Sequence, residues 1–241
     1  MKKLNNLLKG HRYIAFLDFE GTQFSHEMIA LGAVLAVLDK NGHIKKLKPS
    51  LKIYVKAKNK IGKYVTDLTG ITQDTLDKKG VSFAKAMQEL KKYLGLHFKK
   101  CSFITYGNHD MRILGQSISY NLDAPKEICQ QIQKNYIDYS VFINEFIRDK
   151  NGNPLSLVHN CELFGVALVG EAHDPAVDAI NLANLYEAFL NHQDLVAEQY
   201  KAAVTKSGHF PSPVLNVIRK LNEGETVTPE IYEQEIKDYL K

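Results

Sequence analysis

Two apolar stretches near the N-terminus constrain the fold of this chain more than any other feature. Residues 13–19 (YIAFLDF) and residues 28–38 (MIALGAVLAVL) are rich in aliphatic and aromatic side chains. Apolar runs of this kind are typical of buried β-strands. The chain has 241 residues, of which 44% are hydrophobic and 24% charged, so it has enough apolar surface for a globular core. A mainly disordered state is therefore excluded.

The rest of the chain combines further strands with amphipathic helices. Strands are predicted over residues 44–55, 101–106 and 135–139, and Pro49 indicates that the first of these lies at an edge of the sheet or contains a break. Helices are predicted over residues 110–120 and 125–134, after Ser82, after Ser156, and from Asp174 and Pro175 onwards. This order predicts an α/β domain, a mixed β-sheet with helices on both faces. We expect residues 1–190 to form this domain and residues 191–241 to form an α-helical C-terminal extension packed on it.

Cysteine content and hydropathy indicate a reducing, aqueous compartment. Cys101, Cys129 and Cys161 are too few and too widely spaced for a disulfide framework or a thiolate zinc site. No apolar run approaches the roughly 18–20 residues that span a bilayer. The N-terminus lacks the apolar core and cleavage site of a signal peptide. We therefore expect a cytoplasmic protein with no membrane partner.

The balance of charge is mildly basic. The chain carries 31 Lys and Arg residues against 27 Asp and Glu, a formal net charge of +4, which permits a polyanionic partner without requiring one. Lysines crowd residues 40–63, and acidic residues gather after residue 222. The lysine-rich segment is interpreted either as a solvated edge that protects a strand from aggregation or as a contact for nucleic acid.

Two carboxylates interrupt the end of the first apolar strand. Asp18 and Glu20 stand two residues apart, so both side chains lie on the same face of that strand. Two such carboxylates repel each other, and one stays protonated unless a cation sits between them. Hard carboxylate oxygens suit Mg²⁺ or Mn²⁺. An ordinary turn is the alternative interpretation of this pair.

Two further aspartates stand at helix starts. Asp110, in YGNHD, falls where a strand turns into a helix, and by itself it fits a helix cap or an early helical aspartate that the helix dipole favours. Asp178 lies four and seven residues before Leu182 and Leu185, on the apolar stripe of the last core helix. Because burial of an unpaired carboxylate is costly, its position on that stripe favours a functional role over a solvent-exposed one.

A histidine precedes this last helix. His173 lies five residues before Asp178, just outside the predicted start of the helix. An imidazole titrates near neutrality, so a loop histidine beside a water molecule bound to a metal is suited to act as a general base. The chain contains 9 histidines, and position alone distinguishes His173 from the others.

Together these residues resemble the motifs of one enzyme family. FLDFEGT, YGNHD and the His-x4-Asp of residues 173–178 resemble the three motifs of the DEDD exonucleases of the RNase H-like fold, in the subclass with a catalytic histidine. HEMIALGAVL is similar to the second strand of that family, and YVTDLTGIT (residues 64–72) to its loop containing Gly-Ile. The resemblance covers about residues 11–190.

The resemblance implies a metal-dependent 3′→5′ exonuclease. Asp18, Glu20, Asp110 and Asp178 would hold two divalent cations, Mg²⁺ or Mn²⁺, which in such sites lie about 3.5–4 Å apart. His173 would take the proton of the attacking water, and each cleavage would release a nucleoside 5′-monophosphate. A phosphodiester is anionic and its transition state more so, which is why carboxylates alone would repel it.

The resemblance also indicates how the substrate binds. The substrate would be the 3′ end of single-stranded nucleic acid. The Asp-Phe-Glu-Gly-Thr form of the first motif and the Gly-x-x-Asp of the second favour RNA or short oligonucleotides, with DNA as the other possibility. Thr22 would contact the terminal 3′-OH. Leu68, Thr69 and Ile71 would pack against or wedge the terminal base, or else are ordinary loop residues around Gly70. Gly21 and Asn108 complete the expected substrate-binding set.

Two other functions compete with the exonuclease. The first is a catalytically idle nucleic-acid-binding module that uses residues 40–63. Such a protein would be expected to have lost some of the five chemical positions, by which we mean Asp18, Glu20, Asp110, His173 and Asp178, and all five are present. The second is a module that delivers another nuclease or polymerase to its partner through residues 191–241. We expect a monomer or a homodimer.

Overall fold

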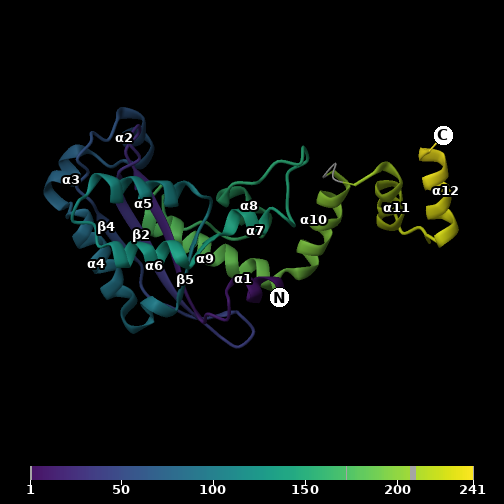
Figure 1. The fold of residues 1–241 in the computed structure, drawn as a ribbon, viewed down its shortest axis with the longest axis horizontal. Helices are drawn as coiled ribbons and strands as arrows, with labels where there is room; N and C mark the ends of the chain where they lie inside the picture. The colour runs from purple at the N-terminus through teal and green to yellow at the C-terminus, as the bar shows by residue number, and fades with distance from the viewer. Residues whose placement is uncertain (1, 172, 207–209, 241) are drawn as a thin grey trace. The chain divides into compact units, whose positions relative to one another are not determined.

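The computed structural model describes residues 2–171, 173–206 and 210–240. The chain divides into two compact units (Figure 1). The first unit consists of Met1–Val141 and Ser156–Asn191, and the second of Phe142–Leu155 and His192–Lys241. All five predicted chemical positions belong to the first unit, so this unit alone carries the candidate site.

A mixed sheet forms the centre of the first unit. Its strands are β1 (Tyr13–Gly21), β2 (Met28–Leu38), β3 (Ile44–Leu47), β4 (Leu51–Tyr54), β5 (Cys101–Thr105) and β6 (Tyr136–Asp138). The strand order is β3-β2-β1-β5-β6, and β4 also pairs with β2. The pairs β1–β2, β2–β3 and β2–β4 are antiparallel, whereas β1–β5 and β5–β6 are parallel. The predicted mixed sheet is confirmed.

The segment 44–55, for which an edge strand or a break at Pro49 is predicted, is broken. The segment forms two short strands, β3 and β4, separated by residues 48–50, which include Pro49. β3 pairs with the end of β2 (Ala36↔Leu47), and β4 with its middle (Ala33↔Leu51). Proline has no N–H to donate to a strand ladder, and the break falls at that residue.

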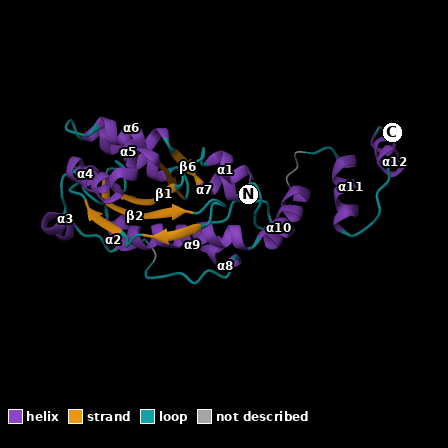
Figure 2. Ribbon diagram, turned by 90° about the horizontal axis from the view of Figure 1, so that it is seen from below, coloured by secondary structure: helices purple, strands orange, loops and turns teal. Residues whose placement is uncertain are grey.

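Helices cover both faces of the sheet. Their bounds in the first unit are α1 (Lys2–Leu7), α2 (Lys63–Thr69), α3 (Gln73–Lys79), α4 (Phe83–Leu94), α5 (His109–Tyr120), α6 (Lys126–Lys134), α8 (Leu157–Leu163) and α9 (Pro175–Asn191). A 3₁₀-helix, η1 (Gly95–Lys100), follows α4, and α7 (Tyr139–Ile143) follows β6. Figure 2 shows the sheet between α4, α5 and α6 on one side and α9 on the other. Among the described residues, no helix has the length and apolar character needed to cross a membrane.

The alternation of β1 side chains explains the two helical layers. Leu17 and Phe19 belong to the core that also contains Phe83 of α4. On the opposite face, the Phe16 ring meets the Tyr186 ring of α9, with centroids 5.5 Å apart. Side chains two residues apart share a face, so Asp18 and Glu20 point to the same side as Phe16, towards α9. Asp18 and Glu20 therefore lie on the face of the sheet that α9 covers, and α9 carries Asp178.

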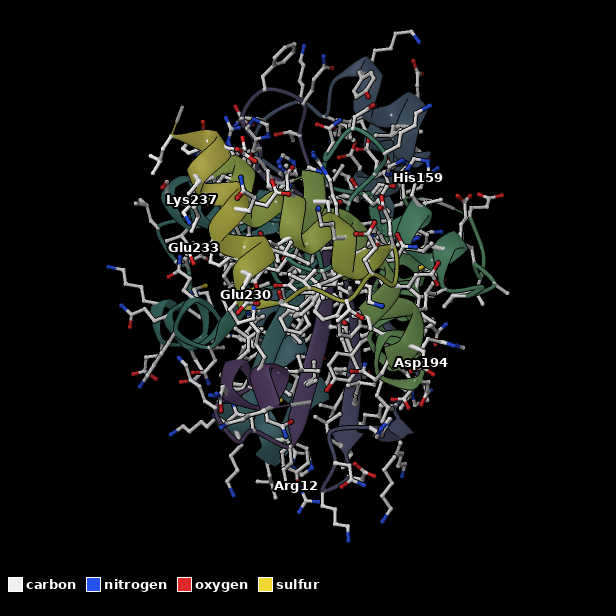
Figure 3. The ribbon with its side chains drawn as sticks, turned by 90° about the vertical axis from the view of Figure 1, so that its right-hand side faces the viewer. Arg12, His159, Asp194, Glu230, Glu233 and Lys237 are labelled. Atoms are coloured by element: carbon white, nitrogen blue, oxygen red, sulfur yellow. The ribbon has the colours of Figure 1, made fainter. Side chains whose placement is uncertain are left out.

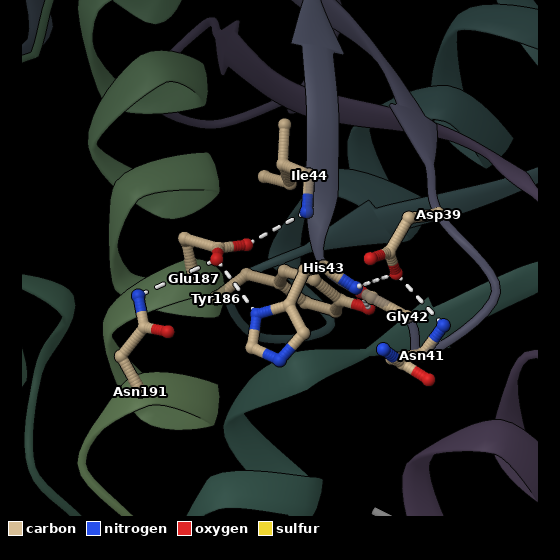
Figure 4. A network of polar contacts seen from close by, with 8 residues as sticks. All are labelled: Asp39, Asn41, Gly42, His43, Ile44, Tyr186, Glu187 and Asn191. Carbon is tan, nitrogen blue, oxygen red and sulfur yellow. Dashed lines mark hydrogen bonds and ion pairs between the residues drawn. The ribbon is translucent and has the colours of Figure 1, made fainter.

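A polar network ties the C-terminal half of α9 to the turn between β2 and β3 (Figure 4). Glu187 accepts hydrogen bonds from the Ile44 N–H at 2.7 Å and lies 2.8 Å from His43 Nδ1. The Tyr186 hydroxyl donates to the Gly42 carbonyl at 2.8 Å. Within the turn, Asp39 accepts from two backbone N–H groups, including that of His43 at 3.0 Å. This network holds α9 in a fixed place along the sheet.

The segment expected to be a loop at residues 64–72 is mostly helical. Residues 64–69 belong to α2, which ends at Gly70, a residue with φ 68°. Glycine adopts this left-handed conformation without the steric penalty of a Cβ atom, which is why the helix ends here. Thr72 then caps α3, since its side chain accepts a hydrogen bond from the Thr75 N–H.

The C-terminal part of the second unit, His192–Lys241, is mainly helical where the structure describes it. It contains α10 (Gln193–Lys206), α11 (Ser212–Asn222) and α12 (Pro229–Tyr239). Asn216 of α11 donates to Glu235 of α12 at 2.8 Å, and Lys220 lies 3.3 Å from the same carboxylate. Glu233 and Lys237, labelled on α12 in Figure 3, form an ion pair at 2.7 Å. The helical nature of the extension agrees with the sequence, whereas its packing on the first unit stays a prediction.

Candidate active site

The site begins where β1 extends beyond its parallel neighbour. The last pair between β1 and β5 is Phe16↔Ile104, so the Phe19 N–H lies beyond the shared ladder. The Asp110 carboxylate accepts this N–H at 2.7 Å. A buried backbone N–H without a partner is unfavourable, and Asp110 satisfies it from the first turn of α5. The carboxylate is thereby fixed between the backbone positions of Asp18 and Glu20.

Two residues of β6 hold the turn that brings Asp110 to this place. Asp138, at the end of β6, accepts hydrogen bonds from the Gly107 N–H at 3.0 Å and from the Ser140 N–H at 2.9 Å. The Tyr136 hydroxyl donates to the Gly107 carbonyl at 2.8 Å. Gly107 has φ 100°, a conformation open to glycine. The entry into α5 is therefore rigid, which suits a residue that must be placed accurately.

A glycine lets α9 approach the sheet beside Asp18. Gly32 of β2 pairs directly with Asp18, so both face α9. A Cβ atom on Gly32 would lie 1.9 Å from the Pro175 carbonyl oxygen, so the backbone at the start of α9 occupies the space of a side chain. Asp178 lies in the first turn of this helix. The missing side chain at residue 32 is what allows that first turn to lie against the sheet.

The five predicted chemical positions line one cleft. Asp18, Glu20, Asp110, His173 and Asp178 all contribute to a cavity of about 500 Å³. They come from one strand and from the beginnings of two helices that follow it far along the sequence. The structure thus brings together the residues that the motifs predicted to act together.

The carboxylates in the cleft disfavour their own ionisation. Burial, followed by repulsion from Asp110 and Glu20, raises the pKa of Asp18 well above its ordinary value. Burial and repulsion from Asp178 and Asp110 raise the pKa of Glu20 from 4.5 to about 8. Burial raises the pKa of Asp110 to about 7, although the hydrogen bond from the Phe19 N–H opposes this. The pKa of Asp178 is raised by burial too. A cation bound among these carboxylates would stabilise their ionised forms, which the surrounding side chains do not stabilise enough to keep the pKa values low.

His173 lies at the rim of the cleft, beside two of the acids. Its Nδ1 atom is 4.0 Å from Glu20 Oε1, and its side chain is 45% exposed. Its backbone N–H donates to Asp178 Oδ2 at 3.0 Å. Its backbone φ is 63°, a left-handed conformation that residues other than glycine rarely adopt. The imidazole is thus accessible to solvent and held close to the carboxylates.

The donor set of the cleft fits divalent cations. Ligand atoms of Glu20, His173 and Asp178 lie within 4.8 Å of one another. Asp18 and Asp110 line the same cleft and act electrostatically on the same carboxylates. Several carboxylate oxygens and an imidazole converging on one cavity, with the ionised forms destabilised, suit Mg²⁺ or Mn²⁺.

The residues expected to bind substrate fall into two groups. Gly21, Thr22 and Leu68 line the cleft, whereas Thr69, Ile71 and Asn108 are not among its described lining residues. Thr22 is buried; its hydroxyl accepts from the Glu27 N–H at 2.9 Å and lies 2.6 Å from the Ser25 hydroxyl. Ile71 is 3% exposed and packs against other apolar residues. Their roles in binding stay predictions.

Several lining residues were not predicted. The cleft is also bounded by Gln23, His26, Tyr64, Val65, Tyr106, His109 and residues 156–158. The His26 and His109 rings meet edge to face, with centroids 5.2 Å apart, and His26 has φ 50°. The sequence offered a signal for four of them, since Tyr106 and His109 stand in YGNHD, and Tyr64 and Val65 begin YVTDLTGIT. The others reach the cleft through tertiary packing.

Comparison with known proteins identifies similar chains. The family model described as Exonuclease (RNase_T) matches residues 15–186. The nuclease domain of 3′hExo, described as a DEDDh family member bound to rAMP, is 23% identical, with a TM-score of 0.60 over 78% of this chain and 94% of that one. A 3′-exonuclease solved for recognition of the histone mRNA stem-loop is 22% identical, with a TM-score of 0.60 over 81% of this chain and 71% of that one.

A third similar structure is that of E. coli exonuclease I in complex with a dA16 oligonucleotide. It is 17% identical, with a TM-score of 0.57 over 83% of this chain, which spans 46% of that protein. At these identities the likeness shows the shared RNase H-like exonuclease fold, which confirms the predicted fold class. The comparison with curated proteins finds no match.

Proposed function

The chain belongs to the exonuclease family described as RNase_T, and from this premise we propose that it hydrolyses single-stranded nucleic acid from the 3′ end and releases nucleoside 5′-monophosphates. One observation carries the proposal. Four carboxylates with raised pKa values converge on one cleft, with an imidazole at its rim. Such an arrangement is unfavourable in itself, so its presence points to function rather than to stability.

The chemistry divides between the cations and the chain. Asp18, Glu20, Asp110 and Asp178 would hold Mg²⁺ or Mn²⁺, which supply positive charge for an anionic phosphodiester and acidify the attacking water. His173 takes the proton of that water, because its imidazole is exposed to solvent and lies 4.0 Å from Glu20. The backbone N–H of His173 donates to the Asp178 carboxylate, and this hydrogen bond keeps the base close to that carboxylate.

RNA or short oligonucleotides are the preferred substrates in this proposal. The first motif reads Asp-Phe-Glu-Gly-Thr, which resembles the form in the branch of the family that trims RNA 3′ ends. Two of the similar structures support this choice, since one holds rAMP and the other concerns a histone mRNA stem-loop. The complex of E. coli exonuclease I with dA16 keeps DNA as the alternative substrate.

A time course on matched single strands tests the proposal. Single-stranded RNA and DNA of one sequence, labelled at the 5′ end, are incubated with Mg²⁺ or Mn²⁺, and the products are resolved by length. We expect a ladder that shortens from the 3′ end, faster on RNA, and abolished by EDTA. Asp18→Asn and Asp178→Asn should each remove it. Undiminished nucleotide release by both variants would refute the proposed mechanism.

The same experiment separates the enzyme from a catalytically idle binder. A binder that used residues 40–63 would retain the labelled strand, with an affinity that falls steeply as salt rises, and would give no metal-dependent product. The presence of all five chemical positions in one cleft favours the enzyme.

A further inference from the structure

An ion pair joins the sheet to the segment that carries His173. Lys52 Nζ lies 2.7 Å from Asp174 Oδ2, and the two side chains are 29% and 31% exposed. Lys52 belongs to β4 and pairs with Gly32, which in turn pairs with Asp18. The three residues form one row across the sheet, so Lys52 points to the same face as Asp18. The lysine therefore reaches the start of α9 from the row that contains a catalytic acid.

Asp174 uses all of its acceptors at the entry into α9. Its Oδ2 atom pairs with Lys52, and its Oδ1 atom accepts the Ala176 N–H at 3.0 Å. Its backbone carbonyl accepts the Asp178 N–H at 2.8 Å. An aspartate in this position caps the helix and fixes its first turn. Whatever fixes Asp174 therefore also fixes the backbone of Asp178.

His173 precedes Asp174 and needs to be held in place. Its φ of 63° is unfavourable for a residue with a side chain, and such conformations persist where the surrounding contacts enforce them. Its N–H bond to Asp178 provides one contact, and the ion pair of the next residue, Asp174, provides another. Two contacts, one to Asp178 and one through Asp174, thus hold the strained residue against the start of α9.

This ion pair differs from the lysine–carboxylate pairs that lie within single helices of the first unit. Lys63–Asp67, Lys78–Asp74 and Lys85–Glu89 each join residues four apart within one helix. Lys52 and Asp174 are separated by 122 residues, and Lys52 Nζ also lies 5.1 Å from the centre of the Tyr54 ring. Exposed pairs of the first kind contribute little to stability. The pair between Lys52 and Asp174 instead joins β4 to the start of α9 beside the cleft, so it can determine where the His173 segment lies.

We propose that Lys52 is a positioning residue: through Asp174 it holds the segment before α9 so that the His173 imidazole faces Glu20. The inference rests on the proposed exonuclease function for its catalytic consequence. Lys52 touches neither the water nor the substrate in this role. Its loss lowers the rate by misplacing the base, since a displacement of about 1 Å can reduce a rate by roughly 100-fold.

Kinetics of a small set of variants test the proposal. Lys52→Met should lower kcat on single-stranded RNA by about 10- to 100-fold and change KM by less than about threefold. Lys52→Arg, which keeps the charge, should recover most of the rate. Lys78→Met, which breaks an exposed pair within α3, is the matched control and should retain wild-type kinetics. Asp174→Asn, which keeps the acceptor for the Ala176 N–H, repeats the test from the other side of the pair.

A double variant identifies the residue through which Lys52 acts. In a His173→Ala background, Lys52→Met should lower kcat by less than about twofold, because the base that it positions is already absent. An equal loss in both backgrounds would overturn the proposal. So would a Lys52→Met enzyme within about twofold of wild type.

A measurement without metal or substrate separates this proposal from the proposed function. In protein treated with EDTA, Lys52→Met should speed hydrogen exchange at the His173 amide by at least about tenfold, with the middle of α9 unchanged. Unchanged exchange at residue 173 overturns the positioning role even if the enzyme is active. An inactive wild-type protein would refute the exonuclease, while faster exchange in the variant would still support the contact between Lys52 and the His173 segment.

Discussion

Replacement of Gly32 by alanine should displace one half of the site from the other. A Cβ atom at this position would lie 1.9 Å from the Pro175 oxygen, 2.0 Å from its carbonyl carbon and 2.4 Å from the Ala176 nitrogen. All three are backbone atoms, so no side-chain rotation can relieve the overlap. Because Cβ contacts under 3.0 Å essentially never occur, the start of α9 must move by at least about 1.1 Å, the difference between 3.0 and 1.9 Å.

The movement separates Asp178 and His173 from Asp18, which remains on the sheet. A shift of about 1 Å can lower a rate by roughly 100-fold, so we expect at least that loss in single-turnover cleavage of labelled RNA. The overpacked variant should also lose about 1–3 kcal/mol of unfolding free energy, measured by urea denaturation. Weaker binding of Mn²⁺, measured by calorimetry, should accompany both effects.

A glycine in open space provides the control. A Cβ atom on Gly115 of α5 would meet nothing within 4 Å. Gly115→Ala should therefore keep its activity and gain about 0.5–1 kcal/mol of stability, because alanine restricts the unfolded chain and favours the helix. A folded Gly32→Ala protein that cleaves within twofold of the wild-type rate would refute the reasoning, since the position of α9 would then not determine that of Asp178.

Three further predictions follow from the charges and contacts of the cleft. His173→Ala should lower kcat by about 10²- to 10⁴-fold and leave Mn²⁺ affinity within about threefold in calorimetry; a tenfold weaker affinity would instead identify His173 as a ligand. In EDTA, the melting temperature should fall between about pH 5 and pH 8, because the pKa of Glu20 rises from 4.5 to about 8 on folding and ionisation then opposes the folded state. Mg²⁺ should raise the melting temperature more at the higher pH, and a profile independent of pH would contradict this. Glu27→Ala should cost about 1–3 kcal/mol in urea denaturation, because this buried carboxylate accepts the N–H groups of Lys58 and Asn59.

The layers of the fold were accessible from the sequence because their signals are local. The apolar runs at residues 13–19 and 28–38 predicted β1 and β2, since burial on both faces requires apolar side chains at successive positions. Ser82, Ser156 and Asp174 marked helix starts through their capping chemistry. Pro49 indicated that residues 44–55 form an edge strand or contain a break, and β3 and β4 are separated at that residue. α2 was missed because a short segment around Gly70 resembles a loop in composition.

The acidic residues of the site could be predicted because carboxylates are unusual within apolar strands and on apolar helix faces. Asp18 interrupts an apolar strand and Asp178 stands on an apolar helical stripe, but each is a modest signal alone, and the site is recognisable from the combination of the motifs. Lys52 was not recognisable, because it stands among many lysines and its partner lies 122 residues away. Gly32 gave a weak signal, since an isolated glycine within a strand indicates a close backbone approach. The identity of the approaching segment depends on the tertiary fold.

The convergence of the acids depends on two features of the sheet: a backbone N–H without a strand partner and a position without a side chain. β5 stops pairing after Phe16↔Ile104, which leaves the Phe19 N–H for Asp110. Gly32 lacks a side chain, which leaves space for the first turn of α9 and hence for Asp178. Both gaps flank Asp18, one along the strand edge and one across the face. The acidic residues are thus necessary but not sufficient: a chain with the same motifs and a larger residue at position 32 would carry the same acids without bringing them into one cleft.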